Sequence, residues 1–400
     1  MISREPILVA VTNVWPPMAA GSGQALRSML GRRKDTTVIA PRSAGAGDGG
    51  GAKVLPLLRF SGRVGGPLKL WSALQHLEVV LAPLVWCLVR RSPALFVSVQ
   101  PLFAGVGTWL ARRLFGIPYI VVVYGEELTL LLQDRAPMQV RLRLQRLTLR
   151  DAAAVVCITE HTRRIALERY DVPEAKLRIV YPAIDVDQGE DEPASVATAL
   201  RDRFVGPGTR MILTVGRLQE RHKGFDTAVA AMAAVAERVP EARLLVAGPG
   251  DQTTLREAAT RLGVADRVVF TGLLERPDLL RLFRSCDLFL MAGRAVGSTA
   301  EGFGIVYLEA ARFGKPAVAG RAGGAPEAVV DGETGIVVDG ESPAEVAAAV
   351  TRLLTDQQLT ERLGRCGRER VLREFDGHRQ HQQFAAVVED VLDAATRAEV

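Results

Sequence analysis

Short apolar runs alternate along the chain with longer segments of mixed polarity. In the first half, the runs that predict strands are Pro6–Val11, Val38–Ala40, Ala94–Val99, Pro118–Val123 and Ala154–Ile158. Glycine-containing turns and helical patterns follow several of these runs, including a helical pattern that ends near Phe115. This alternation is typical of a parallel sheet that is covered by helices on both faces.

A second series of the same kind begins after a polar stretch. Its expected strands are Met211–Val215, Ala242–Ala247, Val268–Thr271, Leu288–Met291 and Pro316–Ala319. The helices expected between them are Phe225–Arg238, Leu255–Leu262, Leu279–Ser285 and Gly304–Phe313, and the closing helices are Pro343–Leu354, Gln357–Phe375 and His378–Val400. The pattern predicts an α/β protein with two doubly wound domains, in which ligands bind at the carboxyl ends of the strands.

The predicted domain boundary lies where this periodicity is lost. After Val180 the chain becomes irregular, and the dozen residues that follow Asp185 are mostly acidic or polar. We therefore expect a first domain at residues 1–186 and a second at 187–377, with a helix at 378–400 that returns to the first domain. The glycine-rich stretch Gly45–Gly51 predicts a flexible loop.

Length and composition agree with two globular domains. The chain has 400 residues, of which 48% are hydrophobic and 24% are charged. The four cysteines are far apart and form no CxxC pair, so we expect a reduced, cytoplasmic protein. The longest apolar stretches, Val79–Val89 and Leu114–Tyr124, are shorter than the roughly 20 residues of a membrane-spanning helix, and the N-terminus shows no signal-peptide pattern.

Charge divides the chain unequally. Residues 1–186 carry 24 Lys and Arg against 13 Asp and Glu, a balance of +11, whereas the rest of the chain has a balance of −6. Arg141, Arg143, Arg146 and Arg150 alternate with leucines, which is compatible with contact to an anionic membrane surface or with a solvated helix face. Nucleic acid is not an expected partner, because no aromatic residues are interleaved with these arginines.

The most specific motif is the segment Glu301–Ala310, EGFGIVYLEA. Its two glycines precede a helical pattern, so free backbone N–H groups at that point offer an anion site. Glu301 and Glu309 flank this point, and a carboxylate can accept hydrogen bonds from two sugar hydroxyls. The alternative interpretation is a plain helix start with glutamates that compensate the helix dipole.

A second motif supplies positive charge near the end of a predicted strand. Val215-Gly216-Arg217-Leu218 is followed by Lys223-Gly224-Phe225-Asp226, so two cations stand close to the strand tip. Such a pair can neutralise a diphosphate leaving group, although solvated loop residues are the alternative. Three further glycine-containing turns, Ala247–Gly250, Phe270–Leu274 and Gly320–Glu327, are individually weak signals.

The order of these motifs between residues 211 and 340 resembles the retaining glycosyltransferases of family 4, which have the GT-B fold of two Rossmann-like domains facing a central cleft. The resemblance implies an N-terminal acceptor domain and a C-terminal domain that binds a UDP- or GDP-linked hexose of the mannose or glucose type. It also implies catalytic roles for Arg217 and Lys223 at the diphosphate and for Glu301 at the donor sugar, with Glu309 at the ribose. The remaining expected donor-binding residues are Gly23, Gly216, Gly248, Leu273, Leu274, Phe303, Gly304, Ile305 and Val306.

The resemblance is weaker in the first half. Tyr124-Gly125-Glu126-Glu127 stands where family members often carry His-Gly-x-Glu, so Tyr124 and Glu126 are the expected contacts to acceptor or sugar. The stretch from Met291 to Glu327 is similar to the branch of bacterial phosphatidylinositol mannosyltransferases. That similarity favours a lipid-linked or glycan acceptor at the cytoplasmic face of the membrane.

The sequence also offers alternatives to this interpretation. Asp185-Val186-Asp187 spells a metal-binding signature but lies in the expected linker, so we predict no metal and no cofactor. A dehydrogenase is excluded because GxGxxG does not follow the first strand. A nucleotide-sugar epimerase and an inactive nucleotide-binding protein stay open. The expected mechanism is front-face transfer, in which the acceptor hydroxyl passes its proton to the departing phosphate.

Overall fold

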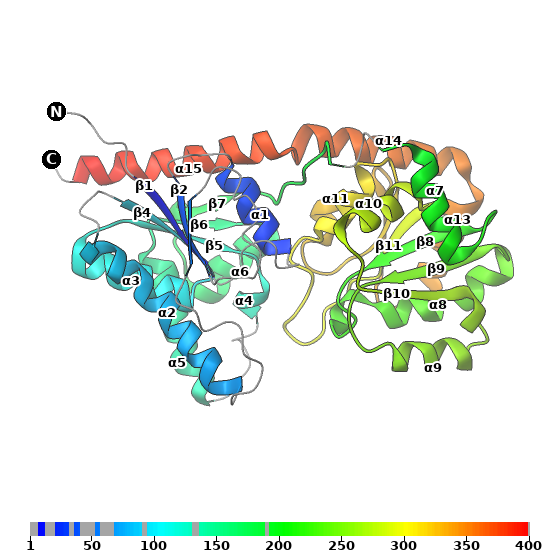
Figure 1. Ribbon diagram of the computed structural model, residues 1–400, viewed down its shortest axis with the longest axis horizontal. Helices are drawn as coiled ribbons and strands as arrows, with labels where there is room; N and C mark the ends of the chain where they lie inside the picture. The colour runs from blue at the N-terminus through cyan, green and yellow to red at the C-terminus, as the bar shows by residue number, and fades with distance from the viewer. Residues whose placement is uncertain are drawn as a thin grey trace. The chain divides into compact units, whose positions relative to one another are not determined.

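A computed structural model describes residues 7–12, 21–31, 36–40, 53–56, 68–89, 94–129, 136–188 and 192–398 of the chain (Figure 1). The chain forms two compact units. Unit 1 comprises Met1–Ala183 together with Gly377–Val400, and unit 2 comprises Ile184–Asp376. The predicted loop Gly45–Gly51 lies outside the described residues.

Unit 1 contains a parallel sheet that, in the described ranges, has seven strands in the order β3-β2-β1-β4-β5-β6-β7. The strands are β1 (Ile7–Val11), β2 (Thr36–Ala40), β3 (Lys53–Pro56), β4 (Ala94–Val99), β5 (Tyr119–Val123), β6 (Ala154–Cys157) and β7 (Leu177–Ile179). The strand order reverses between β1 and β4, as it does in doubly wound sheets. The edge strands β3 and β7 were not expected, because short edge strands carry little apolar pattern.

The helices of unit 1 are α1 (Gly21–Leu30), α2 (Leu68–Val89), α3 (Phe103–Phe115), α4 (Glu126–Thr129), α5 (Ala136–Asp151), α6 (Glu160–Tyr170) and α15 (Gly377–Ala398). α15 packs against α1, where Nδ1 of His381 donates a hydrogen bond of 3.0 Å to the carbonyl oxygen of Met29. α2 and α3 lie very close together, because a Cβ on Gly107 would overlap the carbonyl oxygen of Val80.

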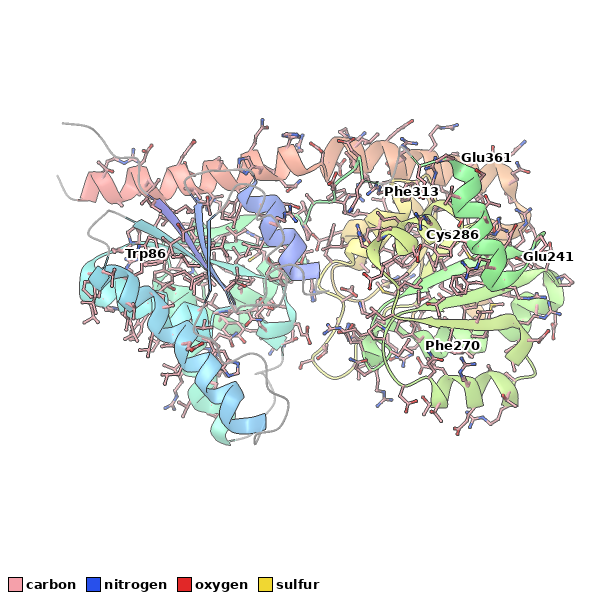
Figure 2. All side chains as sticks on the ribbon, in the orientation of Figure 1. Trp86, Glu241, Phe270, Cys286, Phe313 and Glu361 are labelled. Atoms are coloured by element: carbon pink, nitrogen blue, oxygen red, sulfur yellow. The ribbon has the colours of Figure 1, made fainter. Side chains whose placement is uncertain are left out.

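α2 carries an apolar stripe on its exposed side. Leu77, Leu81, Val85 and Leu88 recur every three or four residues, and Leu88 is 72% exposed. The opposite side of the helix is buried in the core of unit 1 through Trp86, which Figure 2 labels. No helix in the described part of the chain combines the length and apolar character that crossing a membrane requires.

Unit 2 contains a parallel sheet of six described strands in the order β10-β9-β8-β11-β12-β13. These are β8 (Arg210–Val215), β9 (Ala242–Ala247), β10 (Val268–Gly272), β11 (Leu288–Met291), β12 (Ala317–Gly320) and β13 (Gly335–Val338). The helices are α7 (Ala194–Val205), α8 (Phe225–Arg238), α9 (Thr253–Arg261), α10 (Arg276–Ser285), α11 (Ile305–Ala311), α12 (Ala325–Ala328), α13 (Pro343–Thr355) and α14 (Gln357–Glu374). α8 packs with α9 and α13, and α10 packs with α7 and α11, so helices form a separate group on each face of the sheet (Figure 1).

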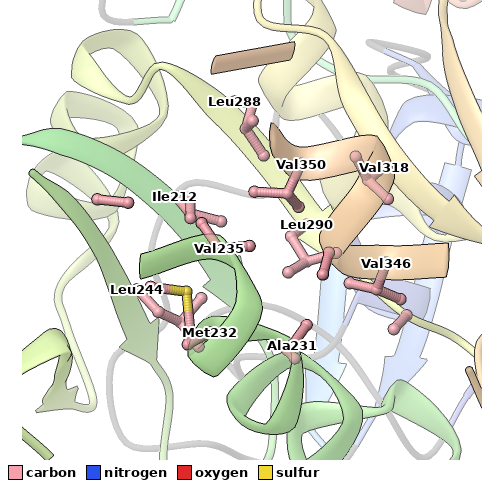
Figure 3. Close-up of a cluster of buried hydrophobic side chains, with 14 of the residues drawn as sticks. Ile212, Ala231, Met232, Val235, Leu244, Leu288, Leu290, Val318, Val346 and Val350 are labelled. Atoms are coloured by element: carbon pink, nitrogen blue, oxygen red, sulfur yellow. The ribbon is translucent and has the colours of Figure 1, made fainter. Parts of the chain in front are cut away.

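The core of unit 2 explains why its strands were readable from sequence. Ile212, Leu244 and Leu290 project from neighbouring strands onto α8 and α13 and are at most 1% exposed (Figure 3). Because both faces of a parallel sheet are buried, its strands appear in the sequence as continuous apolar runs. At the edge strand β10, the half-buried ring of Phe270 is covered by the guanidinium of Arg256, 4.6 Å from its centroid (Figure 2).

Candidate functional site

The carboxyl ends of β8, β9 and β10 meet at three glycines in unit 2. The backbone N–H of Gly216 donates to Ala247 over 3.0 Å, and that of Gly248 donates to Gly272 over 2.9 Å. A Cβ on Gly248 would overlap the carbonyl oxygen of Gly216, and φ at Gly248 is +147°, so a side chain cannot be accommodated there. The glycines therefore bring backbone from adjacent strand ends into direct contact.

Lys223 and Glu301 are brought together at this edge. The Nζ atom of Lys223 lies 2.8 Å from Oε2 of Glu301, and each side chain is only 14% exposed. Burial lowers the pKa of Lys223, but the Glu301 carboxylate outweighs burial and the pKa is raised. Burial likewise raises the pKa of Glu301, yet Lys223 brings it below its usual value. Both groups are thus held in their charged forms at neutral pH.

Arg217 joins the same cluster through a residue that the sequence analysis missed. Its guanidinium pairs with Glu220, whose other carboxylate oxygen lies 3.6 Å from Nζ of Lys223. Arg217 remains 55% exposed, whereas Glu220 is 13% exposed. The spacing of three residues from Arg217 to Glu220 and again to Lys223 was the available signal.

The loop that follows Glu301 starts α11 with a glycine in the left-handed region. Gly304 has φ of +86°, and a Cβ there would meet the ring of Tyr307, whose hydroxyl donates to the Met291 carbonyl over 2.8 Å. Ile305 and Val306 are half-buried at the first turn. Phe303 is 1% exposed and its ring packs near Phe375, so any donor contact of Phe303 would come from its backbone.

Glu309 forms a second cluster with a partner that the sequence analysis also missed. Its carboxylate is 3% exposed and pairs with Arg276 at the start of α10. Nε of Arg276 also lies 3.4 Å from the side-chain oxygen of Gln188. Nothing in the local sequence relates Arg276 to Glu309, because the pair joins two elements that are 33 residues apart.

The Asp185-Val186-Asp187 segment has a structural role. The buried guanidinium of Arg312 donates to the carbonyl oxygens of Asp185, over 2.6 Å, and of Gln188. The Asp185 carboxylate accepts from the backbone N–H of Asp187 over 3.3 Å. Among the described residues, no group of three or more His, Cys, Asp and Glu is arranged to hold a metal ion.

Leu273 and Leu274 lie directly after β10. Leu273 is 65% exposed and Leu274 is half-buried, beside the strand end at Gly272. Both are expected donor-binding residues, and a contact between them and the base of the donor stays a prediction.

Gly23 and the acceptor-side residues belong to unit 1. Gly23 lies in the first turn of α1, and Tyr124 follows β5, with a buried hydroxyl that has no hydrogen-bond partner among the described residues. Glu126 is exposed, whereas Glu127 turns inward and accepts from the Tyr124 backbone N–H over 2.5 Å. Burial raises the pKa of Glu127 to about 7. The His-Gly-x-Glu spacing itself corresponds to Glu127, so the choice of Glu126 overlooked that signal.

Two family descriptions match the chain. "Glycosyl transferases group 1" matches residues 200–370, and "Glycosyl transferase 4-like domain" matches residues 18–183. The GDP-mannose-dependent alpha-(1-6)-phosphatidylinositol monomannoside mannosyltransferase of Mycolicibacterium smegmatis is 32% identical over 378 residues, which cover 90% of this chain and 92% of the relative. The 2-deoxystreptamine glucosyltransferase of Streptomyces kanamyceticus is 31% identical, over 84% of this chain and 87% of the relative.

A Mycobacterium tuberculosis relative with the same name as the M. smegmatis enzyme is 40% identical over 200 residues. That alignment covers 49% of this chain and 51% of the relative, so the chain matches about half of that protein's length.

Solved structures share the fold of the chain. HepE of Anabaena, solved in complex with UDP and glucose, superimposes with a TM-score of 0.77 at 20% identity, covering 96% of this chain and 99% of that structure. Sucrose-phosphate synthase of Thermosynechococcus elongatus gives 0.78 at 20% identity, with 98% and 100% covered. At this identity the similarity concerns the fold alone.

Proposed function

Since this chain belongs to the glycosyl transferases of group 1, the family predicted from its motifs, we propose that it transfers a hexosyl group from a nucleoside-diphosphate sugar to an acceptor hydroxyl. The observation that carries the proposal is the cluster of Arg217, Lys223 and Glu301 at the carboxyl edge of the unit 2 sheet. The epimerase alternative has no support among the relatives.

GDP-mannose is the donor that we propose to test first. The M. smegmatis relative, which is aligned over most of its length, is named for GDP-mannose, one of the donors within the UDP- or GDP-linked mannose or glucose type expected from the sequence. UDP-glucose is the second donor, because HepE was solved with UDP and glucose. Guanine and uracil differ in size, so the two donors test the base surface at Leu273 and Leu274.

In the proposed mechanism, charge develops on the leaving diphosphate as the bond between the anomeric carbon and the phosphate oxygen breaks. Lys223 and Arg217 stabilise that charge, and they need no metal for this purpose. The acceptor oxygen bonds to the anomeric carbon on the same face and passes its proton to the departing phosphate oxygen. Glu301, held as a carboxylate by Lys223, accepts hydrogen bonds from the donor sugar, and Glu309 accepts those from the ribose.

For the acceptor, we propose a lipid-linked or glycan hydroxyl reached at an anionic membrane surface. Unit 1 supports this with the exposed apolar stripe of α2 and with Arg143 and Arg146, which are exposed on α5. Both elements pack against α3. Apolar contact combined with basic charge is the usual basis of peripheral membrane binding.

A thermal-shift screen of the full chain against GDP, UDP, ADP and NAD tests the donor site. We expect one nucleoside diphosphate to raise the melting temperature, and we expect Lys223→Ala to abolish the shift. Lys315→Ala is the matched control, because Lys315 is another lysine of unit 2 without a proposed role. Transfer assays with the sugar donors of the nucleotide that binds then follow. A shift with NAD alone, or a full shift in Lys223→Ala, would contradict the proposal.

A further inference from the structure

Three charged residues of alternating sign stand three positions apart after β8. The backbone N–H of Glu220 donates to the Arg217 carbonyl over 3.0 Å, and that of Lys223 donates to the Glu220 carbonyl over 3.0 Å. Lys223 closes the short 3-10 helix Arg221–Lys223, and Glu220 is its N-cap residue. In such turns the side chains at positions i and i+3 eclipse one another, so all three side chains share one face.

Glu220 lies between the two cations of the proposed diphosphate site. Oε1 pairs with the Arg217 guanidinium, and Oε2 lies 3.6 Å from Nζ of Lys223. Lys223 is also paired with Glu301 at 2.8 Å. Two cations and two carboxylates leave this cluster with no net charge when no donor is bound.

Carboxylate and phosphate oxygens accept hydrogen bonds from the same guanidinium and ammonium donors. We propose that Glu220 is an internal competitor of the donor's diphosphate, which holds Arg217 and Lys223 in the empty site and lowers the affinity for the nucleoside-diphosphate product. This inference rests on the proposed function. Glu220 acts through the two cations and is therefore a positioning residue.

Competition by Glu220 acts on turnover through the release of the nucleoside-diphosphate product. Cations that stabilise charge developing on a leaving diphosphate also bind the released product tightly, and product release limits the turnover of many enzymes. A fixed negative charge beside both cations weakens product binding. Arg217, which is 55% exposed, can exchange Glu220 for a phosphate without unfolding the turn.

The test compares Glu220→Gln and Glu220→Asp in the full chain. The dissociation constants of GDP and UDP are measured by calorimetry, and the KM for the donor and kcat are measured in transfer assays. Loss of one negative charge near a diphosphate is expected to tighten product binding by roughly tenfold in Glu220→Gln. Both KM and kcat should then fall, because product leaves more slowly. Glu220→Asp keeps the charge and should bind close to the wild type.

A purely structural role of Glu220 predicts the opposite sign, because disordered cations would bind the nucleotide more weakly. Glu237→Gln, an exposed residue of α8, makes the same change in net charge and should leave binding unchanged. Glu220→Asn is a second neutral variant with the same expected tightening, should Glu220→Gln not fold. Unchanged or weaker binding of GDP and UDP in the neutral variants overturns only the role proposed for Glu220 and leaves the proposed function in place. Wild-type protein that binds no nucleoside diphosphate overturns the proposed function and this inference together.

Discussion

At the scale of the residue, the candidate site contains largely buried carboxylates that are compensated by neighbouring cations. Lys223 pairs with Glu301, and Arg276 pairs with Glu309, which is 3% exposed. Removing one member of a buried pair leaves the other without compensation in a poorly solvated place, which typically costs about 3 kcal/mol or more. For variants of the two pairs, the free energy of unfolding and the binding of the donor are therefore measured separately.

Arg276→Ala is expected to lower the free energy of unfolding by about 2–4 kcal/mol, because the Glu309 carboxylate stays buried without its cation. The KM for the donor should rise as Glu309 loses its fixed orientation. Chemical denaturation and steady-state kinetics measure the two effects. The double variant Arg276→Ala/Glu309→Gln should recover stability but not donor affinity. Recovery of both stability and donor affinity would contradict the proposed contact of Glu309 with the donor.

The raised pKa of Glu127 predicts that the free energy of unfolding depends on pH. Burial raises its pKa to about 7 from an ordinary value of 4.5, so the folded state retains a proton that the unfolded state releases. The stability contributed by this proton is complete below pH 4.5 and is lost as the pH rises to about 7. Across that window the wild type should lose about 1–3 kcal/mol relative to Glu127→Gln. Parallel unfolding curves for the two proteins between pH 5 and 7.5 would contradict this assignment.

The proximity of the candidate residues was predictable from sequence where glycine-containing motifs mark strand ends and helix starts, whereas their roles stay predictions. Arg217, Lys223 and Glu301 were identified because glycines on either side mark strand ends and helix starts, and the structure brings these side chains together. Arg276 escaped notice because side-chain pairing across 33 residues has no local pattern. The His-Gly-x-Glu spacing corresponds to Glu127 rather than to the expected Glu126, and the structure shows that Glu127 is the carboxylate that turns inward.

At the scale of the element, packing of glycine against backbone sets the positions of α2 and α3. Gly107 of α3 faces the carbonyl of Val80 so closely that a methyl group would overlap it. Gly105, two positions earlier, has no neighbouring atom closer than 3.4 Å to its would-be Cβ. A side chain is therefore sterically excluded at Gly107 but can be accommodated at Gly105.

We expect Gly107→Ala to destabilise unit 1 by about 1–3 kcal/mol, because the helices must move apart. Gly105→Ala, the matched control, should be neutral or stabilising by up to about 1 kcal/mol, since alanine favours a helix more than glycine does. Urea unfolding monitored by circular dichroism measures both changes. Equal effects of the two substitutions would mean that the close approach of α2 and α3 has no energetic weight.

The exposed stripe of α2 leads to a prediction about membranes. Leu81→Glu/Val85→Glu places two charges on the stripe without touching the buried side of the helix. Co-sedimentation with vesicles that contain anionic lipid should fall strongly, whereas the melting temperature should change little. Analytical ultracentrifugation serves as the control, because a second copy of the chain covering α2 would appear as a dimer that the variant dissociates. Equal vesicle binding by variant and wild type would contradict a contribution of the α2 stripe to membrane binding.

The elements themselves were largely readable from sequence. The strand predicted at Ala94–Val99 has the same bounds as β4, and Leu288–Met291 has those of β11. Buried parallel strands give continuous apolar runs, whereas the edge strands β3 (KVLP) and β7 (LRI) contain a charged residue that shortens or interrupts the run. The expected and observed bounds differ most at helix starts, because α10 begins at Arg276 rather than at the expected Leu279.

At the scale of the whole molecule, unit 2 is continuous in sequence and unit 1 is not. All residues of the proposed diphosphate cluster lie within Ile184–Asp376, which has its own hydrophobic core. Unit 1 requires Gly377–Val400, whose helix α15 packs on α1. The GT-B fold predicted from motif order is confirmed by the structural comparisons.

A fragment of residues 184–376 should therefore fold cooperatively and bind the same nucleoside diphosphate as the full chain. Removal of residues 377–400 from the full chain should instead lower the stability of unit 1, because α1 loses its contact with His381. Calorimetric unfolding and nucleotide titration of the fragment and of the shortened chain measure these effects. A fragment that folds but binds no nucleotide would mean that residues outside unit 2 supply essential donor contacts.

The contact of α15 with α1 also means that unit 1 cannot be completed during synthesis until unit 2 has been translated. The segment that completes unit 1 is translated after the whole of unit 2. At 5–20 residues per second, roughly 10–40 s separate the emergence of Ala183 from that of the last residues of this chain. The unit whose synthesis begins first is therefore finished last, and during that interval the surface of α1 that α15 will cover is open to chaperones.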